Sequence, residues 1–308
     1  MKIVFLDTAT MGDVSFAPIE QTGELVCYTS SDREEALSRV GDCEVLIVNK
    51  VFADRELIDA APKLKLICVA ATGVNNVDTE YAALKGIPVR NAAGYSTDSV
   101  AQTTFMMILS LVGKTRSFDD YVKSGEYSRS GLFTDAGRLF FELSGKNMGI
   151  IGLGTIGRRV AKIAEAFGMN VRYFSTSGTS HSREYPSISL QELLESSDIV
   201  SIHAPYNART AGLIGQAELS MMKRTAYIIN MGRGGIIDEA ALAEAVDAGT
   251  IAGAGCDVFV REPLPEDNPL MKVRRKDRLI LTPHIGWASA EARRRLVSII
   301  AENIAKGF

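Results

Sequence analysis

The stretch from Met148 to Val160 constrains the fold of this chain more than any other. An apolar run leads into three glycines with the spacing G-x-G-x-x-G, at Gly152, Gly154 and Gly157, and a helical pattern follows. A strand, a glycine turn and a helix in this order predict a cradle for a pyrophosphate. The spacing alone also fits an ordinary glycine-rich turn, so the choice between the two depends on residues further along the chain.

Two α/β domains are predicted around this stretch, because 308 residues are enough for two cores. From Met148 onward, six apolar runs separated by helical patterns predict a complete doubly wound dinucleotide-binding fold. These runs are Met148–Ile151, Val171–Phe174, Ile199–Ile202, Ala226–Asn230, Ile251–Cys256 and Leu279–Leu281.

The first hundred residues predict a smaller α/β domain. Buried parallel strands are expected at Ile3–Leu6, Val45–Val48 and Leu66–Val69, and a helix is expected to begin at a capping Asp32. A final helix from about Ser289 comes too late for the six-strand sheet, and we expect it to cross back to the first domain. The expected domains are therefore residues 1–98 with 287–308, and residues 99–286.

Composition limits the partners and the compartment. The net charge of −3 and the pI of about 5.8 give no electrostatic case for nucleic acid. The longest uncharged run falls short of the roughly 20 apolar residues that span a membrane. Four widely spaced cysteines indicate reduced thiols rather than disulfides or a metal site. We therefore expect a cytoplasmic protein without metal.

Chemically useful side chains follow four of the predicted strands, where open α/β sheets bind ligands. Arg233 lies in a glycine-rich loop and could grip a carboxylate with both arms of its guanidinium. Asp257 could accept from a carboxamide, orient a neighbour or cap a turn. Glu262 precedes a proline, and alone it would be read as a surface glutamate. His284, after Pro283, fits a general acid or base.

The two other histidines are weaker candidates for the acid. His181 lies in a Ser/Thr-rich loop and is expected to be exposed. His203 also ends a strand, but we expect it to line the nucleotide site, because its strand is two elements away from the Arg233 and Glu262 loops.

Taken together, these motifs resemble the D-isomer-specific 2-hydroxyacid dehydrogenases. The resemblance covers nearly the whole chain. It is carried by Gly152–Gly157, Asn230–Gly234, Cys256–Phe259 with Glu262-Pro263, Thr282–His284, Ala71–Asp78 and Ser99–Thr104. It implies two doubly wound parallel-sheet domains, a flavodoxin-like substrate domain and a Rossmann dinucleotide-binding domain.

The resemblance also implies roles for single residues. Arg233 would hold the substrate carboxylate, His284 would donate a proton to the 2-oxo oxygen, and Glu262 would orient the His284 ring and stabilise its protonated form. Gly73 and Val74 would complete the carboxylate site. The cofactor would lie across Thr104, Gly152, Gly154, Thr155, Ile156, Gly157, Ser175, Pro205, Met231 and Asp257.

The substrate is expected to be a small 2-oxoacid. Asn49–Val51, Ala71–Gly73 and His284–Ser289 look most like the glycerate dehydrogenase and hydroxypyruvate reductase branch, and Trp287 would narrow the pocket. No regulatory domain is expected after Phe308, which argues against the longer phosphoglycerate enzymes. Two alternatives stay open: a reductase of D-lactate type or for other 2-oxoacids, and a nucleotide-sensing protein like the corepressors that resemble this family.

The choice between NAD(H) and NADP(H) also stays open. Members that prefer NAD usually have an acid after the second strand of the nucleotide domain, whereas this chain has Ser175, Thr176 and Ser177. These hydroxyls could donate to a 2′-phosphate, with Arg183 nearby. The irregular segment from Arg116 to Leu143 has no firm assignment, although the resemblance implies a homodimer in which it could take part.

Overall fold

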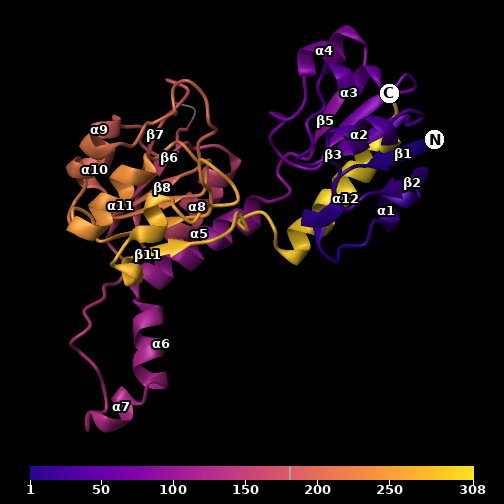
Figure 1. Cartoon of the computed structure of the whole chain (residues 1–308). Helices are drawn as coiled ribbons and strands as arrows, with labels where there is room; N and C mark the ends of the chain where they lie inside the picture. Colours follow the sequence, from indigo (N-terminus) through magenta and orange to yellow (C-terminus); the bar gives the residue numbers. More distant parts are fainter. Residues whose placement is uncertain (180–181) are drawn as a thin grey trace. The chain divides into compact units, whose positions relative to one another are not determined.

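The computed structural model describes residues 1–179 and 182–308, so His181 lies outside the described residues. The chain forms two compact units (Figure 1). The first consists of Met1–Ser96 and Trp287–Phe308, and the second of Thr97–Gly286.

The first unit is built on a five-stranded parallel sheet with the order β2-β1-β3-β4-β5. This is the flavodoxin-like order. Its strands are β1 (Lys2–Phe5), β2 (Glu24–Cys27), β3 (Val45–Val48), β4 (Leu66–Val69) and β5 (Val89–Asn91). Strand β2 was not predicted, because it lies at an edge and is only half-buried, so it lacks the continuous apolar run of β3 and β4.

Helices cover both faces of this sheet. Three of them pack on the face that carries Val4, Leu46 and Ile67, whereas α1 and α12 pack on the face that carries Phe5 and Ile47. The helices of the unit are α1 (Ala17–Glu20), α2 (Arg33–Arg39), α3 (Arg55–Asp59), α4 (Thr79–Leu84) and α12 (Ala290–Ala305), with a short 3-10 turn at Thr8–Met11.

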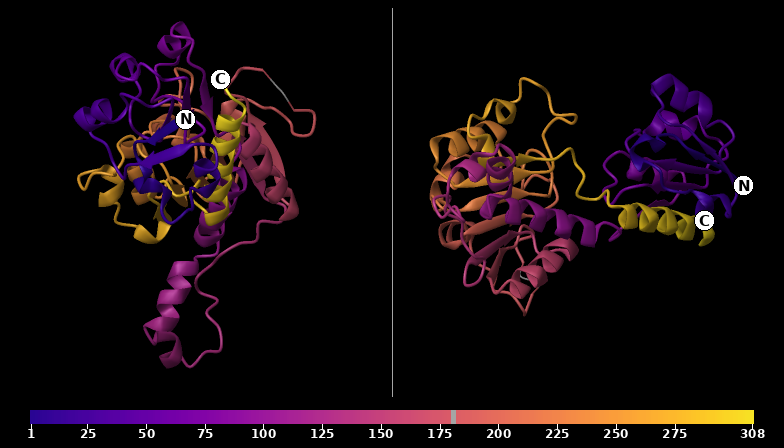
Figure 2. Two further views of the ribbon diagram at one scale, coloured as in Figure 1. Left: turned by 90° about the vertical axis from the view of Figure 1, so that its right-hand side faces the viewer. Right: turned by 90° about the horizontal axis from the view of Figure 1, so that it is seen from below.

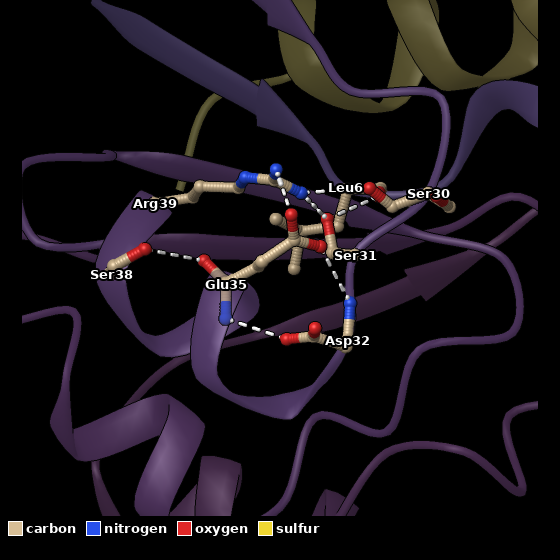
Figure 3. A network of polar contacts seen from close by, with 7 residues as sticks. All are labelled: Leu6, Ser30, Ser31, Asp32, Glu35, Ser38 and Arg39. Atoms are coloured by element: carbon tan, nitrogen blue, oxygen red, sulfur yellow. Dashed lines mark hydrogen bonds and ion pairs between the residues drawn. The ribbon is translucent and has the colours of Figure 1, made fainter.

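Asp32 caps helix α2, as predicted. The Asp32 carboxylate accepts the Glu35 backbone N–H at 2.9 Å, and Glu35 Oε2 accepts the Asp32 N–H at 3.0 Å (Figure 3). Arg39, in the last turn, donates to the Ser30 carbonyl, the Ser31 hydroxyl and Glu35, and Ser31 donates to the Leu6 carbonyl at 2.6 Å. This network fixes the helix against the carboxyl end of β1.

The last helix, α12, completes the core of the first unit. Its Leu296, Val297 and Ile300 are buried in the same cluster as Ile3 and Phe5. Ser289 caps it by accepting the Ala292 N–H. The chain thus leaves the first unit after Ser96 and returns to it at Trp287.

The second unit has six parallel strands in the order β11-β10-β9-β8-β6-β7. They are β6 (Asn147–Ile151), β7 (Asn170–Phe174), β8 (Ile199–Ile202), β9 (Tyr227–Asn230), β10 (Gly253–Cys256) and β11 (Leu279–Leu281). The number and places of the strands are as predicted, except that β10 begins two residues late. Ser187 extends the sheet beyond β7 by a single bridge to Tyr173. The strand order reverses between β6 and β8, and ligands bind at such a point.

Helices cover both faces of the second sheet as well. Two pack on the face that carries Ile150, Ile199 and Ile229: α5 (Thr97–Val112) and α8 (Thr155–Ala166). Three pack on the opposite face, which carries Val200 and Ile228: α9 (Leu190–Ser196), α10 (Gln216–Met221) and α11 (Glu239–Ala248). Short 3-10 turns lie at Pro269–Lys272 and Lys276–Arg278.

The segment from 115 to 142 forms an arm of the second unit. It contains α6 (Thr115–Lys123), α7 (Glu126–Arg129) and a returning loop, and it extends away from the sheet of that unit (Figures 1 and 2). Neither helix of the arm has a buried residue, and Phe133 is 91% exposed. Among the described residues, no helix is long and apolar enough to cross a membrane.

Candidate active site

The glycine loop lies at the point where the strand order reverses. Gly152 follows β6 with a φ of +91°, and a Cβ there would lie 2.9 Å from the backbone of Ala204, which follows β8. A Cβ on Gly157 would lie 2.3 Å from the Gly152 carbonyl oxygen. A side chain at either position would collide with the neighbouring backbone, so both positions require glycine.

Gly154 differs from these two glycines. It is the N-cap of α8 with an extended backbone, and a Cβ there would meet nothing within 4 Å. Among the described residues, the backbone N–H groups of Leu153, Gly154, Thr155 and Ile156 make no hydrogen bond. Free N–H groups at a helix start, beside a space kept clear by glycine, fit the pyrophosphate of a dinucleotide.

Three further residues are expected at the cofactor, and two of them, Pro205 and Met231, follow strands of this sheet. Thr104 is fully buried on α5, where its hydroxyl donates to the Val100 carbonyl at 2.8 Å. Pro205 lies in the loop after β8, and its carbonyl accepts the Thr210 hydroxyl. Met231 follows β9 and is buried against α5 and α8.

Asp257, at the end of β10, fixes the turn that carries His284. One carboxylate oxygen accepts the Thr282 hydroxyl and the Ile285 N–H, and the other accepts the Gly286 N–H at 2.7 Å. The side chain is buried, which raises the pKa of Asp257, while these three hydrogen bonds oppose the shift. Of the roles considered for Asp257, the one that orients a neighbour is therefore present.

His284 has a left-handed backbone with a φ of +53°. Non-glycine residues adopt this conformation only when their surroundings hold them there. Here the bonds to Asp257 hold the chain on both sides, at Thr282 and at Ile285. The backbone conformation therefore helps to set the direction in which the His284 side chain points.

Glu262 and His284 form a close pair. The His284 Nδ1 lies 2.7 Å from Glu262 Oε2, and Glu262 Oε1 accepts the Phe259 N–H at 3.0 Å. The His284 side chain keeps 24% of its surface exposed, and among the described residues its ring bonds through Nδ1 and not through Nε2. The pair therefore presents one oriented imidazole nitrogen to solvent.

The loop that contains Arg233 is held by hydrogen bonds from Asn230 and by close packing at Gly234. Asn230 is buried, accepts the Gly232 N–H at 3.1 Å and donates to the Arg233 carbonyl at 3.0 Å. A Cβ on Gly234 would lie 1.9 Å from the Phe259 carbonyl oxygen. The Arg233 loop therefore packs directly on the loop that holds Glu262.

The guanidinium of Arg233 has no carboxylate partner within the described ranges. Its Nη1 donates to the Gly232 carbonyl at 2.9 Å, and the side chain is otherwise exposed. A guanidinium without an acid beside it is suited to bind an anionic ligand.

His203 is half-buried, and it follows β8 next to Ala204, which the glycine loop approaches. Its Nε2 lies 2.8 Å from the Ser201 hydroxyl, and its buried Nδ1 has no hydrogen-bond partner in the described part of the chain. Burial lowers the pKa of His203 to about 3, so the ring is neutral at pH 7. A neutral ring in this place is compatible with a wall of the nucleotide site, and it lacks the proton that a general acid needs.

Ser175 follows β7 and belongs to a tight polar turn. Its hydroxyl lies 3.1 Å from that of Ser177 and donates to the Thr179 carbonyl. The cation at this turn is Arg209, whose Nη1 donates to the Ser177 carbonyl at 2.7 Å. Sequence reasoning missed Arg209, because it lies in the loop after β8, more than thirty positions from Ser175.

The other expected substrate residues lie in the first unit. Gly73 and Val74 follow β4, and their backbone N–H groups make no hydrogen bond among the described residues. Val74 also lines a mostly apolar cavity of about 490 Å³ with residues of α4 and β5. Trp287 packs edge-on against Tyr95 with ring centroids 6.2 Å apart. Across both units, no group of three or more His, Cys, Asp or Glu among the described residues could hold a metal ion.

Comparison with known proteins places this arrangement in a family. Residues 105–286 match the family described as D-isomer specific 2-hydroxyacid dehydrogenase, NAD binding domain. The hydroxypyruvate reductase of Blautia hydrogenotrophica is 36% identical, over 99% of this chain and 96% of its own.

Two solved structures illustrate the range of relatives. The NADPH-dependent glyoxylate/hydroxypyruvate reductase of Sinorhizobium meliloti in complex with NADP and malonate has a TM-score of 0.82 and 28% identity, covering 99% of this chain and 92% of its own. The D-lactate dehydrogenase of Aquifex aeolicus with NAD and lactic acid has a TM-score of 0.83 and 30% identity, covering 98% and 94%. The chain belongs to the D-isomer-specific 2-hydroxyacid dehydrogenase family.

Proposed function

We propose that this enzyme reduces a small 2-oxoacid, hydroxypyruvate or glyoxylate, to the D-2-hydroxyacid with NADH or NADPH. The observation that carries the proposal is the His284–Glu262 pair, 2.7 Å apart, in which Glu262 lies on the loop that packs on the Arg233 loop. An oriented imidazole and an unpaired guanidinium provide what the reduction of a 2-oxoacid requires, a proton donor and an anchor for the carboxylate.

The proton is assigned to His284. Glu262 accepts a hydrogen bond from Nδ1, which orients the ring and stabilises the imidazolium. Nε2 then donates its proton to the 2-oxo oxygen as that oxygen becomes a hydroxyl. When bound, the nicotinamide supplies the hydride to the carbonyl carbon. Arg233 holds the substrate carboxylate and polarises the 2-oxo group, so that a single face of the carbonyl carbon is presented.

The cofactor is assigned to the carboxyl end of the second sheet. Gly152, Gly154 and Gly157 shape the cradle, and the N–H groups of Thr155 and Ile156 bind the pyrophosphate. The remaining walls are assigned to Thr104, Ser175, Pro205, Met231 and Asp257.

The first unit is proposed to be the substrate domain. The unpaired N–H groups of Gly73 and Val74 would bind the substrate carboxylate, and the bulk of Trp287 would favour small substrates. The second unit is the dinucleotide-binding domain, and the enzyme is proposed to be cytoplasmic.

We also propose a homodimer formed through the arm of the second unit. The arm exposes apolar side chains that no other part of the described chain covers: Val122, Leu132, Phe133, Leu139 and Phe140. A set of this size is typical of an interface between subunits.

The substrate is tested with a panel of 2-oxoacids, using purified enzyme with NADH or NADPH and following the loss of nucleotide absorbance. Turnover of hydroxypyruvate or glyoxylate well above that of pyruvate supports the proposal. Faster turnover of pyruvate would support a D-lactate-type enzyme instead.

The alternative function is that of a nucleotide-sensing protein without catalytic activity. The variant His284→Ala distinguishes this alternative from an enzyme. We expect this variant to lose 10²- to 10⁴-fold in kcat, the contribution typical of one general acid, while its Kd for the nucleotide is unchanged. A wild-type protein that binds nucleotide but turns over no oxoacid would contradict the enzyme assignment.

A further inference from the structure

The loop after β8 places a cation on the turn that follows β7. Arg209 Nη1 donates to the Ser177 carbonyl at 2.7 Å, and a Cβ on Gly178 would lie 3.8 Å from the same nitrogen. A guanidinium has five N–H donors, so most of them stay available after this bond. Within the described ranges, no carboxylate pairs with Arg209.

The base of Arg209 is held in place. Its backbone N–H donates to the Asn207 side chain at 2.9 Å, and the neighbouring Thr210 is fully buried. The Thr210 hydroxyl donates to the Pro205 carbonyl and accepts the Asn207 N–H. These bonds hold the backbone at Arg209, and the bond from Nη1 to the Ser177 carbonyl directs the exposed side chain to the turn after β7.

The turn itself offers hydroxyls and no acid. The residues from 175 to 179 are Ser, Thr, Ser, Gly and Thr, and the hydroxyls of Ser175 and Ser177 lie 3.1 Å apart. In a dinucleotide fold, this strand end lies at the adenosine ribose, where an acid pairs with the 2′-hydroxyl and a nearby arginine accommodates a 2′-phosphate. A further arginine of this region, Arg158 on α8, lies 3.9 Å from Glu184, which offsets its charge.

We propose that Arg209, together with the Ser175 hydroxyl once it turns from the Thr179 carbonyl to the ligand, forms a binding site for the 2′-phosphate, so that this enzyme prefers NADPH to NADH. The proposal rests on the proposed function, because it concerns the cofactor of the same reaction. It makes Arg209 a residue that determines cofactor specificity by charge-assisted hydrogen bonds to the phosphate.

The test measures binding by calorimetry and needs no turnover. Wild-type enzyme is titrated with NADPH, NADH, adenosine 2′,5′-bisphosphate and AMP. We expect NADPH to bind at least tenfold more tightly than NADH, and the bisphosphate to bind more tightly than AMP. Equal affinities within each pair would overturn the proposal, whereas binding of none of the four would contradict the proposed function itself.

Three variants test which residues form the 2′-phosphate binding site. Arg209→Gln is expected to weaken NADPH binding at least tenfold and to leave NADH within twofold. Ser175→Asp should reverse the preference by adding the acid that repels a phosphate. Arg172→Gln is the matched control, because Arg172 lies on β7 and is exposed but pairs with Glu192. If Arg209→Gln weakens both nucleotides equally, or leaves both unchanged, Arg209 does not read the 2′-phosphate.

Discussion

At the scale of single residues, Asp257 shows how one buried carboxylate can position another residue. Its three hydrogen bonds hold Thr282, Ile285 and Gly286, on both sides of the left-handed His284. The sequence motif identifies His284 as a candidate, but the hydrogen bonds of Asp257 that hold its turn are visible only in the structure.

Replacement of Asp257 by Asn should therefore impair turnover more than stability. The amide can accept on one side only, so at least one N–H of the turn loses its partner, at about 1–3 kcal/mol. We expect kcat to fall more than tenfold with little change in the Kd for NADPH. Asp238→Asn is the matched control, since it caps α11 with two similar bonds and Asn is an equally good cap. A higher Kd with normal kcat would mean that Asp257 acts only as a wall of the cofactor site and does not position His284.

His203 should make the enzyme sensitive to acid. In the folded state burial lowers its pKa to about 3, while an unfolded histidine titrates near 6.5. The unfolded state therefore binds more protons below pH 6.5, and the stability present above that pH is lost as the pH falls towards 3. For a group this buried, the loss reaches about 3 kcal/mol by pH 4.

The variant His203→Gln tests this, because Gln can keep the hydrogen bond to Ser201 without gaining a charge. Urea denaturation at pH 7 and pH 4 should show a smaller loss of unfolding free energy in the variant than in the wild type. Identical losses would show that carboxylates alone set the acid sensitivity.

At the scale of elements, the three glycines of the loop after β6 have different tasks. A Cβ on Gly157 would collide with the Gly152 carbonyl, whereas a Cβ on Gly154 would enter free space. The sequence motif does not distinguish the three positions. Only the structure shows which glycine is needed for packing and which one leaves room for the ligand.

We therefore expect Gly154→Ala and Gly157→Ala to behave oppositely. Gly154→Ala should keep Tm within about 2 °C, since its backbone is extended, but raise the Kd for NADPH at least tenfold. Gly157→Ala should lower Tm by several degrees, because helix and strand must move apart. Differential scanning calorimetry and nucleotide titration give both numbers, and a fall in Tm for Gly154→Ala would contradict the assignment.

Strands buried on both faces are the most direct to predict. Strands β3, β4, β8 and β9 are fully buried, so each appears as a continuous apolar run. Strand β2 is not predicted because its burial is partial. The predicted β10 is two residues too long because Ile251 and Ala252 are apolar but lie in a bend before the strand. In the site, residues at strand ends could be predicted, but the approach of the Arg233 loop to Phe259 depends on backbone packing at Gly234.

At the scale of the whole molecule, the arm is the feature that the sequence left unassigned. Its two sides hold each other through Phe118 with Phe140 and through Tyr121 with Tyr127. Its apolar surface is nevertheless open, which is why we assign it to the dimer.

Substitution of both Leu132 and Phe133 by Asp should convert the dimer to a monomer, because two charges cannot be buried unpaired in an apolar interface. Sedimentation equilibrium measures the change. Leu84→Asp is the control, as Leu84 is 83% exposed on α4 of the first unit. A double variant that stays dimeric would place the interface elsewhere.

The edge-on contact of Tyr95 with Trp287 has a consequence for how such a chain can be cut and rejoined. The two rings flank the points where the chain leaves and re-enters the first unit, and Arg295 also donates to the Tyr95 carbonyl at 3.0 Å. Residues 97–286 are therefore an insertion in the first unit, which the chain leaves and re-enters at neighbouring points. The first unit, with Ser96 connected to Trp287 by a short glycine linker, should fold alone with a cooperative thermal transition. The separate second unit should still bind nucleotide.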